Sequence, residues 1–426
     1  MNQAPSVGCR RPRGGSRMPR RAGVLLVGCA LAAVLASAAP SPAPRVVAVG
    51  DAHGDARALS SILSRVGLID AQRRWAGGSA VLVVTGDYLD RGPDVPEVVE
   101  LLMSLEDQAK RAGGRAIIIM GNHEAMNAMG DLRYVAPEAF ASFAGAKSEE
   151  RRAKAWRQYE RLAKNRREAL NRTSEALPVP KVYQPPSEAE WLAAHPPGLL
   201  EYREAFASHG RYGRWIRRQP VLMRVGDTIF VHGGLHPDLM VKRLDDLTAR
   251  IHRELEAFDG MREWMLREGI ALPFFNFDEL LEAGRSELSR VRAKAEGDPM
   301  VLTRHPLAPL EDIGGWLTVS PNGPLWFRGF ALWTEEEGPT MVDRLQQQYG
   351  PIRFVVGHTQ AESRRITPRF AGRVFLIDTA MSSVYEDGRP SALDIDAGEY
   401  TAVTLEDRAV LVSASTGPKP ASTRPN

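Results

Sequence analysis

Three apolar, β-branched runs in the first third of the chain each stop directly before a glycine and are followed by polar residues. They cover residues 45–49, 81–85 and 116–120. Such runs are typical of buried strands. Two segments with apolar residues at helical spacing, 56–66 and 95–105, separate them. This alternation predicts a βαβαβ core in which the carboxyl ends of the strands face one site.

The rest of the chain contains further strand patterns and two helical segments. Residues 221–225 and 228–232 predict a hairpin around a Gly-Asp turn, and residues 238–297 have helical spacing. Four more strands are expected at 352–356, 373–377, 400–405 and 409–413. We therefore predict a fold of the α/β class with a core formed by residues 39–137 and 216–413.

Residues 138–215 differ from the core in composition. They are rich in Arg, Lys, Glu and Ala, with a proline-rich break near residue 180. This composition predicts a helical insertion, which forms either a cap over the site or a solvated surface excursion. Residues 414–426 are rich in Pro, Ser and Thr, which predicts a disordered tail.

The first 38 residues have the composition of a secretory signal peptide. A basic segment from Met18 precedes an apolar run, and Ala36-Ser37-Ala38 follows as a cleavage site. We expect an exported protein of the bacterial periplasm. The segment around Cys29 also resembles a lipobox, which would give a lipid-anchored protein instead. Because both cysteines, Cys9 and Cys29, lie in this leader, the mature chain would have no disulfide and no cysteine nucleophile.

The charge balance excludes a general affinity for nucleic acid. The formal net charge is +3, but six arginines and no acidic residue lie in the leader. The mature chain would therefore carry about −3, which predicts no nucleic-acid partner. The apolar run of the leader is short for a bilayer and is followed at once by prolines, so we expect no membrane span in the mature form.

Seven polar residues follow strand patterns and share the donor types that metal ions bind. They are Asp51, His53, Asp87, Asn122, His123, His232 and His358. Carboxylate, amide oxygen and neutral imidazole together suit transition metals and not calcium, which needs more oxygen ligands. One such residue alone is more often a satisfied polar side chain than a ligand. Seven in the same context predict two metal ions, manganese, iron or zinc, held close together.

The segments that carry these residues resemble the signatures of the calcineurin-like metallophosphoesterases. Asp-Ala-His-Gly begins at residue 51, Gly-Asp-Tyr-Leu-Asp-Arg-Gly at 86, Gly-Asn-His-Glu at 121, His-Gly-Gly at 232 and Gly-His at 357. The second signature is similar to that of the phosphoprotein phosphatase branch. Residues 121–134 and 225–234 resemble the Shewanella-like protein phosphatases. The resemblance implies an α/β/β/α sandwich of two mixed sheets with helical insertions.

The resemblance also implies a role for each site residue. Asp51 and His53 would hold one metal, Asn122, His232 and His358 the other, and Asp87 would bridge them. A hydroxide activated by the two metals would attack phosphorus. Arg91, and Arg328 by its position, would bind the phosphate, while His123, held by Asp90, would protonate the leaving oxygen. Ala380 departs from the family pattern, which more usually has glycine there, and would be strained if that position needs a positive φ.

The resemblance implies a metal-dependent phosphatase that hydrolyses phosphate monoesters on phosphorylated proteins or peptides, with phosphotyrosine favoured over phosphoserine and phosphothreonine. Two alternatives stay open. Dinucleoside polyphosphate hydrolases share much of the motif set. A non-catalytic homologue that binds phosphoproteins should lack a ligand or the acid, whereas all seven strand-end residues are present.

Overall fold

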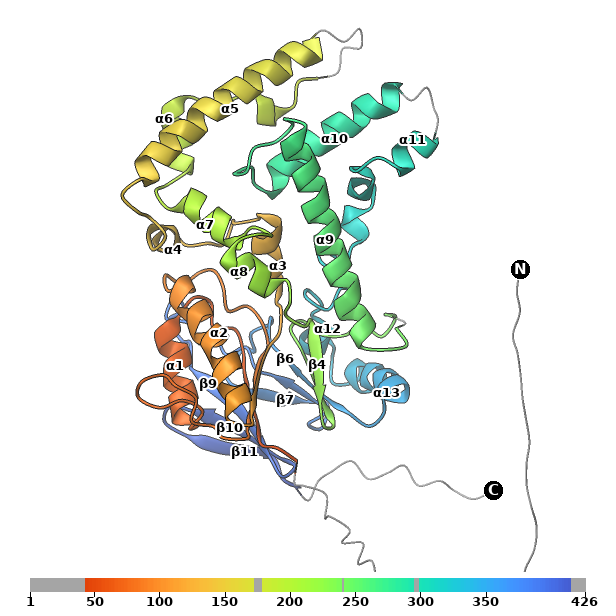
Figure 1. Ribbon diagram of the computed structural model, residues 1–426. Coiled ribbons are helices and arrows are strands. Elements are labelled where there is room, and N and C mark those ends of the chain that lie inside the picture. The colour runs from red at the N-terminus through yellow and green to blue at the C-terminus, as the bar shows by residue number, and fades with distance from the viewer. Residues whose placement is uncertain (1–42, 172–177, 240, 295–298, 415–426) are drawn as a thin grey trace, which may run out of the picture. The chain divides into compact units, whose positions relative to one another are not determined.

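The computed structural model contains two mixed β-sheets, which lie in the lower part of the molecule in Figure 1, below most of the helices. The structure describes residues 43–171, 178–239, 241–294 and 299–414, which belong to one compact unit. The expected signal peptide and all but the first residue of the expected tail lie outside the described residues.

The first sheet has six strands in the order β11-β10-β9-β1-β2-β3. Its parallel half consists of β1 (Val46–Val49), β2 (Val81–Val84) and β3 (Arg115–Ile118), in a register that aligns Val46 with Val81 and Val81 with Arg115. Helices α1 (Ala56–Arg65) and α2 (Val95–Arg111) make the two crossovers. The predicted βαβαβ core is therefore present. Its antiparallel half consists of β9 (Ser391–Asp396), β10 (Glu399–Thr404) and β11 (Arg408–Val412).

The second sheet has five strands in the order β4-β5-β6-β8-β7. Strands β4 (Leu222–Val225) and β5 (Thr228–Val231) form the predicted antiparallel hairpin. Strand β5 then pairs in parallel with β6 (Arg353–Val356), and β6 with β8 (Val374–Leu376). Strand β7 (Thr367–Arg369) completes the sheet at one edge.

Successive side chains of the strands point to opposite faces of the sheet and belong to two different buried layers. Val46 and Ala48 of β1 pack between the sheets with Phe230 and Val355 of the second sheet. Val47 and Val49, on the opposite face of β1, pack against the helices. This is the two-residue period of a strand with both faces buried. The α/β/β/α sandwich that the resemblance implied is thus confirmed.

Helices make up most of the described part of the segment 138–215, as its composition predicted. It contains α4 (Pro137–Ala141), α5 (Ser148–Asn171), η1 (Lys181–Tyr183), α6 (Glu188–Ala194), α7 (Leu199–Phe206) and α8 (Arg211–Ile216). After the hairpin come α9 (Asp245–Arg267) and α10 (Phe277–Lys294), within the second segment of predicted helical spacing. The remaining short helices are α11 (Pro299–Thr303), η2 (Ala308–Glu311), η3 (Ile313–Gly315) and α12 (Gly329–Leu332).

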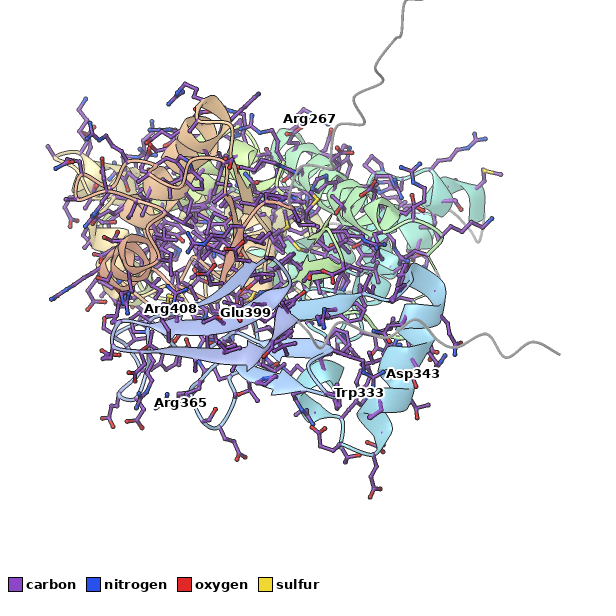
Figure 2. All side chains as sticks on the ribbon, turned by 90° about the horizontal axis from the view of Figure 1, so that it is seen from below. Arg267, Trp333, Asp343, Arg365, Glu399 and Arg408 are labelled. Atoms are coloured by element: carbon purple, nitrogen blue, oxygen red, sulfur yellow. The ribbon has the colours of Figure 1, made fainter. Side chains whose placement is uncertain are left out.

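Several elements had no prediction, among them strands β7 and β9 and helix α13 (Glu337–Tyr349). Several predicted bounds differ from the structure by one or two residues. Strand β3 begins at Arg115 and ends at Ile118, so the expected segment 116–120 ran too far. In the view from below, Asp343 marks α13 and Glu399 and Arg408 mark the antiparallel strands (Figure 2). Among the helices of the described chain, we find none with the length and apolarity needed to cross a bilayer.

Candidate active site

The carboxyl ends of strands from both sheets meet at one cavity of about 370 Å³. The structure places seven of the ten residues expected at the site in its wall: His53, Asp87, Arg91, Asn122, His123, Arg328 and His358. The other three, Asp51, Asp90 and His232, are buried and contact members of that wall. All ten expected residues are therefore brought together.

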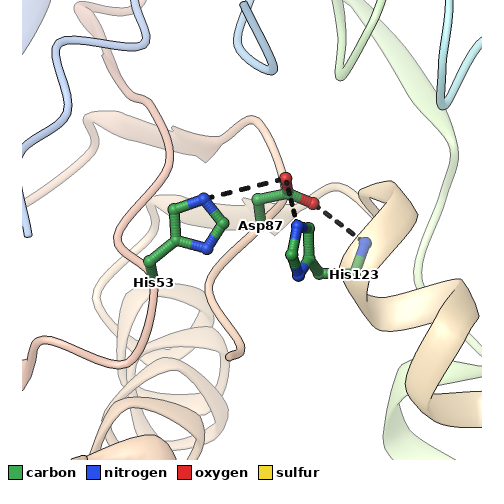
Figure 3. A group of neighbouring side chains, drawn as sticks. All are labelled: His53, Asp87 and His123. Atoms are coloured by element: carbon green, nitrogen blue, oxygen red, sulfur yellow. Dashed lines mark hydrogen bonds and ion pairs between the residues drawn. The ribbon is translucent and has the colours of Figure 1, made fainter. Parts of the chain in front are cut away.

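Asp87 lies at the centre of a first group of possible metal ligands, with His53 and His123 (Figure 3). Its Oδ2 is 4.0 Å from Nε2 of His53 and 3.7 Å from Nε2 of His123. The backbone N–H of His123 donates to Oδ1 over 3.1 Å. Because Nδ1 of His53 lies 3.0 Å from the carbonyl of Leu89, its Nε2 is turned toward Asp87.

Asp87 also belongs to a second group, with His232 and His358. Its Oδ1 is 3.2 Å from Nε2 of His232, and that nitrogen lies 2.9 Å from Oδ1 of Asn122 and 3.2 Å from Nδ1 of His358. Within each group the candidate ligand atoms lie within 4.8 Å of one another. Two groups that share one carboxylate have the composition of a two-metal site.

The protonation of the histidines suits metal binding. Burial lowers the pKa of His53 to about 3, and burial together with His232 lowers the pKa of His358 to about 2. Both rings are therefore neutral near pH 7, and a neutral imidazole is the form that binds a metal ion.

The carboxylates are in the opposite situation, because several lie close together in a buried place. Burial raises the pKa of Asp51 well above its ordinary value, and the negative charges of Asp378 and Asp87 act in the same direction. Burial likewise raises the pKa of Asp378 to about 6. Buried negative charges that repel one another are stabilised by a cation, so the donors present fit the metal ions that the resemblance implied.

Asp378 lines the cavity but was absent from the set of predicted site residues. It lies two residues after the end of β8, the same spacing as Asp51 after β1 and His358 after β6. That context was the available signal. Beside it, Ala380 has a φ of 54° and is fully buried, so the position that more usually holds glycine does have a left-handed backbone here.

A chain of hydrogen bonds holds His123 from behind. Its Nδ1 lies 2.7 Å from Oδ2 of Asp90, and Nδ2 of Asn127 donates to Oδ1 of the same carboxylate over 2.8 Å. The hydroxyl of Tyr202 donates to Oδ1 of Asn127 over 2.7 Å. Burial alone would lower the pKa of His123, but Asp87 and Asp90 outweigh burial and raise it to about 9. His123 therefore has a proton to give.

Tyr202 belongs to α7, so the helical insertion contacts the site through this chain. No residue of the insertion lines the catalytic cavity in the part of the chain that the structure describes. Sequence reasoning missed both Asn127 and Tyr202 as site residues. Whether the insertion also acts as a cap over bound substrate stays a prediction.

Two arginines enter the cavity from different parts of the chain. Arg91 lies between the rings of Tyr134 and Tyr385, at 5.6 and 5.8 Å from their centroids, and donates to the hydroxyl of Tyr385. Arg328 donates to the carbonyl of His358 over 3.1 Å and to the hydroxyl of Thr359 over 2.9 Å. Two guanidinium groups beside one cavity suit a phosphoryl group, whose oxygens accept from their planar forks.

Glu124 supports the loop that carries Asp87 and was not predicted as a site residue. It is fully buried, and its carboxylate accepts backbone N–H groups from Asp87, Tyr88, Leu89 and Gly121 over 2.8 to 3.1 Å. Gly121 is required here, since a Cβ at that position would lie 2.3 Å from Oδ1 of Asp87. The loop and the start of α3 (Asn122–Met129) are therefore fixed against each other.

Five site residues have a left-handed backbone although none is glycine. They are His53, Asp87, Asp90, Arg91 and His358, with φ between 41 and 66°. Each such residue costs about 1 to 3 kcal/mol, and such strain clusters at functional sites where the surrounding structure enforces it. The surrounding structure thus holds the strand-end loops in a strained backbone conformation that places the site side chains around the cavity.

Metal ligands beside a pair of guanidinium groups suit the cleavage of phosphate esters, and the class that this fold and site define is the metallophosphoesterases. Comparison with known proteins agrees. The family model described as calcineurin-like phosphoesterase matches residues 44–362, and the chain belongs to this family.

Two of the proteins that this chain is similar to are named as Shewanella-like protein phosphatases. The chain is 31% identical over 219 residues to Shewanella-like protein phosphatase 2 of Arabidopsis thaliana, which covers 51% of this chain and 53% of that protein. It is 23% identical to Shewanella-like protein phosphatase 1 of Plasmodium berghei, over 85% of this chain and 74% of that one. The chain thus spans about half the length of the Arabidopsis protein.

A solved structure described as a cold-active protein tyrosine phosphatase has the same fold. It aligns with a TM-score of 0.50 at 23% identity, and the match covers 88% of this chain and 80% of that chain. The expected Shewanella-like resemblance is therefore confirmed at the level of family and fold.

Proposed function

We propose that this protein is a two-metal phosphatase that removes phosphate from phosphorylated proteins, with phosphotyrosine as the preferred ester. One observation carries the proposal: the carboxylate of Asp87 faces His53 through Oδ2 and His232 through Oδ1, in the wall of a cavity that Arg91 and Arg328 also line. The names of the Arabidopsis and Plasmodium relatives support a protein substrate.

The chain's own residues would divide the work as follows. Arg91 and Arg328 bind the phosphoryl oxygens and orient the ester. His123, held by Asp90 over 2.7 Å, donates its proton to the departing oxygen. Bound metal ions, which Asp51, His53, Asp87, Asn122, His232 and His358 would hold, supply a deprotonated water and neutralise charge at phosphorus. The donor set accepts manganese, iron or zinc.

The rim of the cavity favours an aromatic ester. Tyr134 is 46% exposed, and its ring centroid lies 5.1 Å from that of His123 and 5.6 Å from the guanidinium of Arg91. Trp326 lines the same cavity. A phenyl ring can stack on such side chains, whereas the short side chain of phosphoserine cannot reach them. The description of the solved structure as a tyrosine phosphatase is in line with this preference.

The test is phosphate release from three matched peptides that differ only in phosphotyrosine, phosphoserine or phosphothreonine. Protein loaded in turn with manganese, iron or zinc is used, with Asp87→Asn as the inactive control. We expect release that depends on metal and is fastest for phosphotyrosine. Metal-loaded protein that is inactive on all three peptides would contradict the proposal. Rapid symmetric cleavage of a dinucleoside polyphosphate would favour the alternative hydrolase, and phosphopeptide binding without release the non-catalytic one.

We also propose that the protein is exported and loses residues 1–38. The support is the basic and apolar leader with its Ala36-Ser37-Ala38 site. The mass of the protein from its native host decides between the two forms of processing. A mature chain that starts at Ala39 is expected, and a lipid-modified Cys29 would replace this proposal with a membrane anchor.

A further inference from the structure

Residues of helices α5, α7 and α9 line a second cavity, of about 460 Å³. Figure 1 shows where these three helices run. It shares no described lining residue with the catalytic cavity. Its volume is within the range of sites that hold small molecules. The metal site and the proposed phosphatase reaction make no use of it.

Two arginines of this cavity are placed without an acidic partner. Arg203 on α7 donates to the backbone carbonyls of Gly130 and Phe275 over 3.1 and 2.6 Å. Arg262 on α9 donates to the carbonyl of Pro273 over 2.7 Å. Among the residues that the structure describes, neither guanidinium has a carboxylate within the 4.0 Å of an ion pair, although most partly buried arginines of this chain do.

The positive charge of this pair is only partly compensated. Burial lowers the pKa of Arg203 to about 10; the carboxylate of Glu279 opposes this shift, and the nearby charge of Arg262 adds to it. Burial also lowers the pKa of Arg262, where Asp259 and Glu263 oppose the shift and Arg217 adds to it. Both groups stay protonated near pH 7, so their mutual repulsion is present in the folded protein and an anion would relieve it.

The remaining wall combines further positive charge with an apolar surface. Arg151 and Lys154 of α5 add two cations, and of the two carboxylates in the lining, Glu204 is already paired with Arg151 over 2.7 Å. The other carboxylate is Glu263, next to Arg262 on α9. The apolar part of the wall is formed by Ala155, Leu200, Leu266, Pro273 and Phe274.

We propose that this cavity is a binding site for a small organic anion, with a carboxylate or phosphate group on Arg203 and Arg262 and an apolar body against Leu200, Leu266 and Phe274. A guanidinium pair recognises the planar or tetrahedral oxyanion through charge-assisted hydrogen bonds. Burial of the apolar body of the ligand against this wall makes a favourable hydrophobic contribution to the binding free energy. Inorganic phosphate would use only the first of these contributions.

Titration calorimetry on the metal-loaded protein tests the site with two probes, 1-naphthoate and phenylphosphonate. Naphthoate offers a carboxylate and phenylphosphonate a phosphate-like group, and each carries an apolar ring for the wall of the cavity. We expect saturable binding of at least one probe, weakened at least tenfold in Arg262→Gln. Binding at the catalytic cavity is unaffected by this change, since Arg262 lies outside it.

Arg267→Gln is the matched control. Arg267 is exposed on the same helix, outside the cavity lining, and is labelled in Figure 2. We expect probe affinity within twofold of the unmodified protein. Lys154→Gln, an exposed change on α5, gives a second test in case Arg262→Gln fails to fold, and should weaken binding at least threefold. Absence of saturable binding of both probes, or equal affinities for the Arg267→Gln variant and the two cavity variants, would overturn the proposal.

Discussion

The hydroxyl of Tyr202 on α7 donates a 2.7 Å hydrogen bond to Oδ1 of Asn127 on α3. Asn127 in turn donates to Asp90, the carboxylate that holds His123. Tyr202 lies in the helical insertion and is fully buried. The described part of the insertion therefore positions the proposed proton donor without lining the cavity in which the ester would bind.

We expect Tyr202→Phe to lower kcat about three- to tenfold and to leave KM within twofold. A lost buried hydrogen bond costs about 1 kcal/mol. The loss should appear in kcat because the proton from His123 is needed only in the transition state and not for substrate binding. The defect should be large for phenyl phosphate and small for 4-nitrophenyl phosphate, whose leaving oxygen needs no proton. Steady-state rates on these two esters measure it.

Tyr212→Phe is the control for that change. Tyr212 lies on the next helix, α8, and its hydroxyl donates to Glu100 over 2.9 Å, away from Asn127. This variant should leave both ester rates within twofold. Equal defects on the two esters in Tyr202→Phe would mean that Tyr202 acts only on stability.

Substitutions of Arg91 and of Asp87 should both lower activity, but only the substitution of Asp87 should lower the metal content of the protein. Arg91→Ala removes a phosphate contact but no metal ligand, so kcat/KM should fall about a hundredfold at unchanged metal content. Asp87→Asn removes the residue that both ligand groups share, so both ions should be weakened together. Metal analysis of dialysed protein decides this, and loss of metal from Arg91→Ala would contradict the assignment.

The strand ends were predictable because glycine and polar residues after an apolar run mark the place where parallel strands meet a ligand site. Asp51, Asp87 and His358 all follow that rule. Strand β9 was missed because Asp394 interrupts its apolar pattern. That carboxylate is buried and pairs with Arg45 and with Arg408, each over 2.8 Å. Arg45 lies 349 residues away along the chain and Arg408 lies 14 residues away.

The missed site residues have a similar explanation. Glu124 and Asn127 act through backbone and side-chain groups that only the folded chain brings near them. Tyr202 reaches Asn127 across 75 positions of sequence. Local pattern identifies a residue that follows a strand, whereas a residue that supports another side chain is recognisable only from their contact.

Glu124→Gln should destabilise the loop that carries Asp87. The carboxylate accepts N–H groups with both oxygens, from Asp87 and Gly121 on one side and from Tyr88 and Leu89 on the other. The amide NH₂ of glutamine is a donor and would face donors on one side. We expect a loss of about 2 to 3 kcal/mol in the free energy of unfolding, measured by urea denaturation, and weaker metal binding.

A control for that substitution is Glu150→Gln, an exposed change on α5. It should change the free energy of unfolding by less than about 0.5 kcal/mol. If Glu124→Gln unfolds at the same urea concentration as this control, the carboxylate does not hold the loop.

His195 should make stability depend on pH through the helical insertion. Its ring stacks on Trp191 at a centroid distance of 3.9 Å, and its Nδ1 lies 2.8 Å from the carbonyl of the same residue. Burial lowers the pKa of His195 to about 4, and the charges of Arg203 and Arg152 act in the same direction.

Above pH 6.5 the ring of His195 is neutral in both states and contributes no pH dependence. As the pH falls from 6.5 to 4, the unfolded chain takes up a proton that the folded protein does not, so stability falls by up to about 3 kcal/mol. His195→Gln should remove the share of this slope that one proton contributes, while the buried His53 and His358 keep theirs. His209→Gln, an exposed change in the loop after α7, should leave the whole slope in place. Urea unfolding of the three proteins between pH 7.5 and pH 4.5 measures the difference, and parallel curves for His195→Gln and the unmodified protein would show that the ring is protonated in the folded state.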